Sequence, residues 1–175
     1  MAFSMGTFGP FAVDHSSDGI DRSSFWREVE GARKGLSESF GLYIFAVERE
    51  DASLYPWYIG KTTATFRKRV GSHLRSMKVL TRIEKKHPGA RVRILFVAFM
   101  TPKRGSVAKT TGSRKRWLDF LETAMIGACL AVNENVLNDK KTVLSRKVPV
   151  PGFLGDDPKD RDRSAKALAK LLRPN

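Results

Sequence analysis

The chain has 175 residues, enough for one domain with a buried core, and its 41% hydrophobic content argues against wholesale disorder. Its 32 Lys and Arg outnumber its 18 Asp and Glu, and the resulting net charge of +14 predicts a polyanionic partner. No apolar run is long enough to span a bilayer, and residues 1–13 lack the features of a secretory signal, so we expect a cytoplasmic protein with no membrane association.

The N-terminal segment predicts little regular structure. Residues 1 to about 24 are rich in Gly, Ser and Asp, a composition typical of a loosely held arm. Residues 25–36 are predicted to form a short helix, because Phe25, Val29 and Ala32 recur at helical spacing. Both segments are expected to precede the main domain.

Two strands and a turn are predicted next. Residues 41–47 have the apolar and aromatic bias of a strand, and residues 55–60 have a similar bias. The polar residues 48–53 between them are typical of a turn. These segments predict an antiparallel hairpin.

A helical region and a buried strand follow the hairpin. Residues 65–77 are predicted to form a helix, and the helical tendency resumes through Lys86 until Pro88 and Gly89 end it. The apolar stripe of the first helix consists of Phe66, Val70, Leu74 and Met77. Residues 91–100 contain the apolar run of residues 94–99, which is typical of a buried strand.

The last third begins with a basic loop and a long helix. Residues 101–112 are predicted to form a flexible loop, and Ser113 is expected to cap a helix that runs to about Val132. Residues 139–158 contain several prolines and glycines and are predicted to connect to a closing helix over residues 160–172.

The order strand, strand, helix, strand, helix predicts an α/β domain. We expect a small, mainly antiparallel, three-stranded sheet flanked by helices. Three regions are expected: an N-terminal arm and short helix over residues 1–39, a central domain over residues 40–139, and a C-terminal extension with a helix over residues 140–175.

One carboxylate in the long helix stands out. Residues 117–132 carry only two charges, Asp119 and Glu122, and Leu118, Met125 and Ile126 share the helix face of Glu122. A carboxylate among apolar groups is costly unless it is paired, protonated or bound to a metal. From the pattern alone, a helix-surface position or a structural salt bridge is the favoured explanation of Glu122, and a metal or catalytic role is the alternative.

Two polar side chains in the first helix share one face. Arg69 and His73 stand four residues apart, beside the apolar stripe. An arginine fork can clamp a phosphate and an imidazole can move a proton, although a solvated basic face accounts for most of the neighbouring cations. Tyr43 and Tyr58 lie on the two hairpin strands, where core packing is the ordinary use of tyrosine.

Taken in chain order, these residues resemble the motifs of the GIY-YIG nuclease family. The Gly-Leu-Tyr of residues 41–43 resembles the first tripeptide, with leucine in place of the usual isoleucine, and the Tyr-Ile-Gly of residues 58–60 matches the second. Matches to the remaining motif positions follow in the family's order, at Lys61, Arg69, His73, Glu122 and Asn138.

The resemblance covers about residues 40–139, which is over half the chain. The position of the family asparagine is left open among Asn133, Asn135 and Asn138, because the interval after Glu122 is longer than in many members. The resemblance implies the GIY-YIG nuclease fold and an endonuclease that hydrolyses phosphodiester bonds.

The resemblance also implies a mechanism and a metal. Glu122 would hold one divalent cation, Mg²⁺ or Mn²⁺, and Arg69 would stabilise the charge on the phosphate. Either Tyr43 or Tyr58 would be the general base, which requires a cationic neighbour such as Lys61, Arg69 or His73 to stabilise its phenolate. Gly41 and Gly60 are expected to be structural, keeping the backbone close to the site.

DNA is the expected partner, and RNA is possible. Contacts to the nucleic acid are expected from the basic residues after the last strand, namely Lys103, Arg104, Lys109, Arg114, Lys115 and Arg116. An ordinary solvated loop explains these residues equally well. The nuclease would work in restriction, defence, mobile-element or repair biology. Two alternatives remain: a non-catalytic, basic nucleic-acid-binding protein on the same fold, and an interaction module whose basic surface docks an acidic protein.

Overall fold

A computed structural model describes residues 4–16, 19–101, 105–109, 112–138, 164 and 166. Within these residues, the elements follow one another along the chain in this order: β1 Ser4–Ala12, β2 His15–Ser16, β3 Gly19–Ile20, α1 Arg22–Ala32, β4 Gly41–Glu48, β5 Leu54–Thr62, α2 Phe66–Ser76, α3 Lys78–Lys86, β6 Arg91–Met100, the 3-10 turn Gly112–Arg114 and α4 Lys115–Leu130.

Four of the strands form one antiparallel sheet in the order β1-β6-β4-β5, and β2 pairs with β3 in a small ribbon. The central strand β6 is predicted well by its apolar run, because it is covered on both faces. Strand β5 lies at one edge of the sheet and β1 at the other. Strand β4 lies inside the sheet, between β6 and β5.

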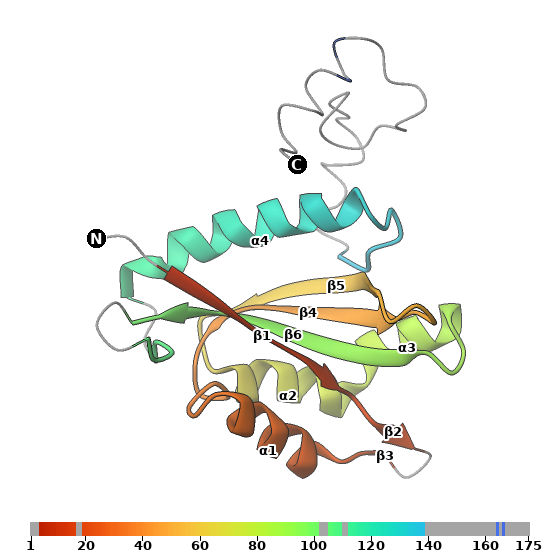
Figure 1. Ribbon diagram of the computed structural model, residues 1–175, viewed down its shortest axis with the longest axis horizontal. Coiled ribbons are helices and arrows are strands. Elements are labelled where there is room, and N and C mark those ends of the chain that lie inside the picture. Colours follow the sequence, from red (N-terminus) through yellow and green to blue (C-terminus); the bar gives the residue numbers. More distant parts are fainter. Residues whose placement is uncertain are drawn as a thin grey trace.

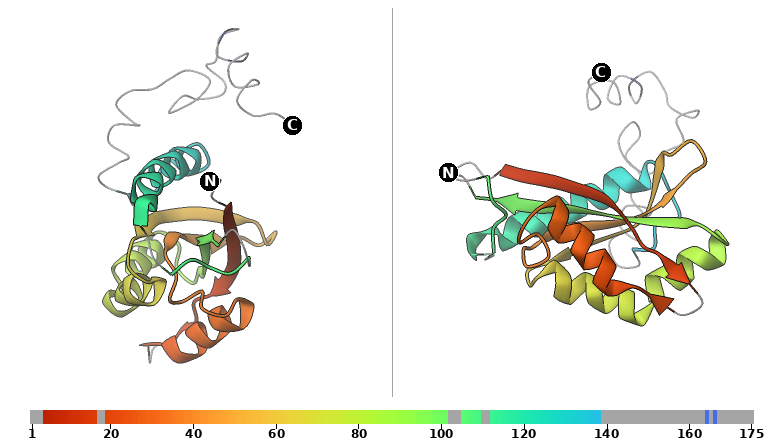
Figure 2. Two further views of the ribbon diagram at one scale, coloured as in Figure 1. Left: turned by 90° about the vertical axis from the view of Figure 1, so that its left-hand side faces the viewer. Right: turned by 60° about the horizontal axis from the view of Figure 1, so that its bottom comes forward.

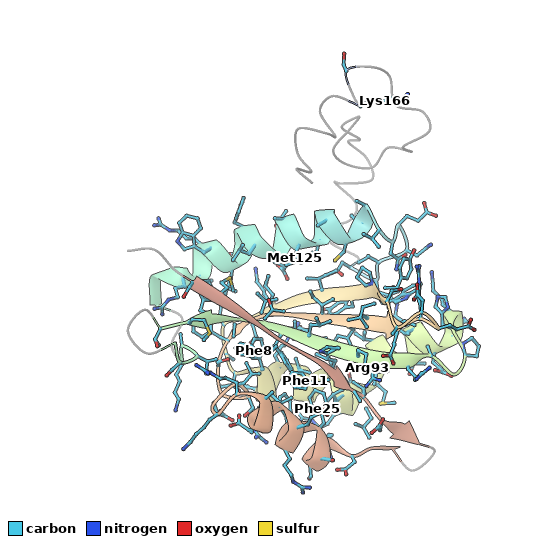
Figure 3. The ribbon with its side chains drawn as sticks, viewed as in Figure 1. Phe8, Phe11, Phe25, Arg93, Met125 and Lys166 are labelled. Atoms are coloured by element: carbon cyan, nitrogen blue, oxygen red, sulfur yellow. The ribbon has the colours of Figure 1, made fainter. Side chains whose placement is uncertain are left out.

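Helices cover both faces of this sheet. Figures 1 and 2 show α4 on one face and α1, α2 and α3 on the other. Because side chains alternate along a strand, Leu42 of β4 packs with Leu118 of α4, while Phe45 of the same strand belongs to the core on the other face. Figure 3 shows Phe11 and Phe25 between the sheet and α1, and Met125 on the sheet side of α4.

Helix boundaries follow from local capping chemistry. The Asp21 carboxylate accepts from the backbone N–H groups of Ser23 and Ser24, and the Thr65 hydroxyl accepts from Lys68 N. These bonds satisfy amide groups that a helix start leaves without partners. Met77 adopts a left-handed conformation between α2 and α3, so the helical region is divided into two segments there.

Several predictions are confirmed and some are wrong. The hairpin, the helix after it and the strand over residues 91–100 are present. The sheet has four strands rather than three, because residues 4–12 pair with β6 and are not a loosely held arm. The long helix has Arg114 as its N-cap, with no capping side chain, because Ser113 lies inside a 3-10 turn. The connector and closing helix predicted after Asn138 fall outside the described residues, apart from 164 and 166.

Candidate catalytic site

The pairing register of the hairpin places Tyr43 directly opposite Gly60. The Tyr43 side chain is fully buried, and its ring lies against the backbone of Gly60. A Cβ atom at position 60 would lie 2.3 Å from the Tyr43 hydroxyl oxygen, far inside van der Waals contact. The absent side chain of Gly60 therefore makes the space in which the phenol sits.

Helix α2 brings two polar side chains to the same phenol. Arg69 Nε donates a hydrogen bond to the Tyr43 hydroxyl at 3.2 Å, and His73 Nε2 lies 2.9 Å from that hydroxyl. Arg69 and His73 reach one oxygen because residues four apart share a helix face. The Tyr58 ring completes the cluster, 6.2 Å from the Tyr43 ring and 5.3 Å from the His73 ring between centroids.

The hydrogen bond from Arg69 has one possible direction: arginine can only donate, so the Tyr43 oxygen accepts. The direction of the Tyr43–His73 bond depends on the imidazole tautomer. In the neutral tautomer with its proton on Nδ1, His73 Nε2 accepts the Tyr43 proton. We call Arg69, Tyr43 and His73 the phenol triad.

Burial sets the protonation states of the phenol triad. Burial, followed by the nearby Arg69 guanidinium, lowers the pKa of His73 to about 4, so His73 is uncharged at neutral pH. Burial also raises the pKa of Tyr43 well above its usual range; the Tyr58 hydroxyl adds to this shift and Arg69 opposes it. The expectation that His73 is a cation beside the phenolate is therefore wrong, because burial and the Arg69 charge both disfavour the imidazolium.

A second cluster lies on the opposite face of β5. The Lys61 ammonium lies 3.2 Å from Glu122 Oε2 and also bonds the Asp119 carboxylate. Asp119 and Glu122 are three residues apart on α4, so both reach the same ammonium. Only 13% of the Glu122 side chain is exposed, and Lys61 compensates its charge in this partly buried position.

The two clusters meet at consecutive residues of the edge strand. Gly60 supports the Tyr43 phenol on one face, and Lys61 turns to α4 on the other. The structure therefore brings Tyr43, Tyr58, Arg69 and His73 into one cluster, and it places Glu122 with Lys61 on the other face of the edge strand β5. Lys61 does not supply the phenol triad with charge, since its ammonium is directed to the carboxylates of α4.

Gly41 has a clear structural reason. Its φ of 153° lies in a region that side-chain-bearing residues rarely adopt, and a Cβ there would lie 2.1 Å from the Val97 carbonyl oxygen. Only glycine allows β4 to approach β6 this closely at the start of the strand.

Among the three candidate asparagines, Asn138 binds the strand that carries the second tripeptide. Its Oδ1 accepts from Ile59 N at 3.0 Å, and its Nδ2 donates to the Ile59 carbonyl at 2.5 Å. Asn133 donates instead to the Pro56 carbonyl at 2.7 Å, and its Oδ1 accepts from Asn135 N. Asn138 is thus a clamp on the backbone of β5 and holds the Tyr-Ile-Gly strand in place.

The predicted nucleic-acid contacts are described only in part. Lys103 and Arg104 fall outside the described residues. Lys109 and Lys115 are exposed and Arg114 is half-buried. Lys109 lies close to Gly35, before β4, whereas Lys115 begins α4.

The donor set around Glu122 fits one magnesium ion held mainly by water. The described residues hold no group of three or more His, Cys, Asp or Glu that could bind a metal. Magnesium accepts one or two carboxylates and keeps several waters, and the Lys61 ammonium already marks this position as one that attracts a cation. Zinc, which prefers several nitrogen or sulfur ligands, does not fit.

The structure adds one residue that sequence reasoning did not select. Asp119 shares the Lys61 ammonium with Glu122, and its spacing of three residues from Glu122 on a helix was the available signal.

Within the described residues, no helix is long and apolar enough to cross a membrane. No protein-family model, curated protein or solved structure matches the chain.

Proposed function

We propose that this protein is a divalent-metal-dependent endonuclease of the GIY-YIG type, which hydrolyses phosphodiester bonds of DNA. The observation that carries the proposal is the phenol triad. Tyr43 comes from β4, and Arg69 and His73 come from α2. Both α2 side chains contact the Tyr43 hydroxyl, Arg69 as a donor and His73 through Nε2. Core packing alone requires no such arrangement.

The phenol triad provides a path for a proton. Tyr43 takes a proton from the attacking water while its own proton passes to His73 Nε2, 2.9 Å away. A neutral His73 is required for this transfer, and its lowered pKa keeps it neutral. Tyr43 is therefore the proposed general base, and the half-buried Tyr58 beside it orients the water.

Arg69 and Glu122 have the electrostatic roles. Arg69 is an exposed residue whose Nε donates to the phenol, so other donors of its guanidinium can contact a phosphate oxygen. Glu122 would hold the cation, which supplies Lewis-acid stabilisation of the phosphate and the leaving oxygen when bound. Lys61 releases Glu122 in that state, and Asn138 and Gly60 position β5.

DNA is the preferred substrate class, with RNA as the alternative. The net charge of +14 provides the attraction for a phosphate backbone. The basic residues at and after the end of β6, Lys103 to Arg116, are proposed to contact the backbone outside the site. A role in restriction, defence, mobile-element or repair biology would follow from this activity.

A non-catalytic nucleic-acid-binding protein is the second candidate. The observation that favours it is the Lys61–Glu122 ion pair, which already compensates the Glu122 charge without a metal. The two candidates differ in turnover, because binding alone requires neither the phenol triad nor a cation.

The test is a cleavage assay on labelled duplex DNA, single-stranded DNA and RNA, with magnesium, with manganese and with a chelator. We expect multiple products from DNA that depend on the divalent cation. Salt-sensitive binding to DNA without cleavage in either metal would instead favour the non-catalytic protein. Absence of nucleic-acid binding at low salt would reject both candidates.

A further inference from the structure

The outer face of α4 carries aromatic side chains in solvent. Trp117 is 43% exposed and Phe120 is 64% exposed. Large apolar side chains are ordinarily covered, and a cluster of exposed ones indicates an interaction site. All three tryptophans lie in the described part of the chain, and the other two, Trp26 and Trp57, are buried.

The exposed aromatics belong to a continuous apolar stripe. Helical spacing puts Trp117 and Phe120 on one side of α4, and the buried Leu118 and Ile126 lie on the side that packs on the sheet. Small side chains continue the outer stripe along the helix, namely Ala124, Ala128 and Ala131. Figure 1 shows no other labelled element over this face of α4.

Cations lie beside the aromatics. The Arg116 guanidinium lies 5.7 Å from the centre of the Trp117 ring, and Lys115 precedes it in the exposed first turn. The first turn of α4 has no acidic residue. An aromatic ring with an arginine over it, next to further positive charge, can stack on a nucleic-acid base while the cations bind phosphates.

Charge decides between the two possible occupants of this face. A second copy of the chain carries the same net charge of +14, and repulsion between the two chains opposes packing of α4 on itself. A polyanion is attracted by the same charge. Bases that are not paired offer open faces to Trp117 and Phe120, whereas the bases of a duplex are stacked and inaccessible to them.

We propose that Trp117 and Phe120 bind unpaired bases, so that the preferred ligand is single-stranded DNA or DNA with an unpaired stretch. This surface, with Lys115 and Arg116 as its phosphate contacts, is called the stacking face. The inference rests on the proposed function in one respect, because it assigns the substrate class of the same protein. Trp117 precedes Glu122 by five residues, or about 7.5 Å along the helix, so a strand bound here lies within reach of the β5 edge.

Intrinsic fluorescence provides a direct probe, because Trp117 is the exposed tryptophan. An oligothymidylate is titrated into the protein in chelator, so that binding is measured without cleavage. We expect strong quenching of the tryptophan emission at saturation, and a duplex of equal length should quench it much less. Unchanged emission at saturating oligothymidylate would overturn the proposal.

A double variant, Trp117→Ala with Phe120→Ala, tests the contribution of the rings to affinity. Single-strand affinity should fall by about tenfold or more, while duplex affinity changes less than about twofold, since stacking contributes only to unpaired bases. Val132→Ala is the matched control. Val132 is 59% exposed and lies beyond the end of α4, and this substitution removes an exposed apolar side chain but no aromatic ring. It should leave both affinities unchanged.

Three results would contradict the stacking face. Equal loss of single-strand and duplex affinity in the double variant would make this a general backbone contact. No loss of either affinity would leave the rings without a role in binding. A dimeric wild-type protein that becomes monomeric in the double variant would assign the face to a second copy. Because these assays use chelator, they separate a failed stacking face from a failed nuclease, which loses cleavage only.

Discussion

The Tyr43 hydroxyl lies 2.9 Å from His73 Nε2 and accepts a hydrogen bond from Arg69 Nε at 3.2 Å. The oxygen thus has a proton acceptor on one side and a cationic donor on the other. A buried phenol with a raised pKa keeps its proton at neutral pH, so Tyr43 can take a proton from water only as it passes its own to a neighbour. The neutral His73 imidazole is the group placed to receive that proton.

The hydroxyl of Tyr43 should be required for turnover rather than for binding. Tyr43→Phe keeps the ring over Gly60 and removes only the oxygen, so we expect single-turnover cleavage to fall by about 100-fold or more with little loss of affinity. Tyr58→Phe should have a smaller effect. Tyr55→Phe is the matched control, because Tyr55 lies on β5 with Tyr58 but next to the hairpin turn, where it pairs with Val47. A larger effect from Tyr58→Phe than from Tyr43→Phe would exchange their roles.

His73 should make folding stability depend on pH in a specific window. Its pKa is about 4 in the folded protein against 6.5 for a free side chain, so the unfolded chain binds about one more proton between these values. Stability is therefore fully present above pH 6.5 and is lost as the pH falls toward 4. His73→Gln keeps an acceptor for Tyr43 but cannot be protonated.

The free energy of unfolding of wild type and His73→Gln should be compared at pH 7 and pH 5 by urea denaturation. The wild-type protein should lose more stability between these conditions than the variant does. An equal loss in both proteins would show that His73 is not held neutral by its surroundings.

Gly60 should not tolerate a methyl group. Gly60→Ala puts a Cβ 2.3 Å from the Tyr43 hydroxyl, and we expect a loss of about 1–3 kcal/mol in the free energy of unfolding together with loss of cleavage. Gly31→Ala is the control: nothing lies within 4 Å of a Cβ there, and alanine in a helix gains about 0.5–1 kcal/mol over glycine. Equal urea midpoints for both variants would contradict the close contact.

The sequence predicted the elements whose signals are local. Strand β6 is an apolar run, and the helix over residues 65–77 has an apolar stripe, a capping threonine and an end at Met77. Strand β1 was missed because its Gly6, Gly9 and Pro10 suggest irregular structure. Its order comes instead from pairing with β6, and Pro10 is tolerated because β1 is an edge strand.

The candidate site was predictable as a set of residues but not as a geometry. The spacing of Arg69 and His73 placed them on one face, but their meeting with Tyr43 depends on how α2 packs across the sheet. The neutral state of His73 follows from burial, which no local pattern reveals. The joint contact of Asp119 and Glu122 with Lys61 likewise depends on which face of β5 carries Lys61 and on how α4 packs against that face.

The basic loop should affect DNA binding and leave the chemistry intact. Replacing Lys103, Arg104 and Lys109 with glutamine should weaken affinity and reduce the slope of log affinity against log salt by up to about 0.9 per lost phosphate contact. Cleavage at saturating DNA should persist. The control removes three other positive charges, at Arg27, Lys78 and Lys85. A loss of cleavage at saturation would instead assign the loop to the catalytic site.

Metal-dependent hydrolysis that requires Glu122 is tested by single-turnover cleavage with Glu122→Gln, on the DNA that the wild-type protein cleaves. Glutamine has nearly the same shape but no charge, so folding and DNA affinity should remain close to wild type. We expect cleavage in magnesium to fall to the level of the chelated wild-type protein. A Glu122→Gln protein that cleaves at the wild-type rate in magnesium would contradict the account.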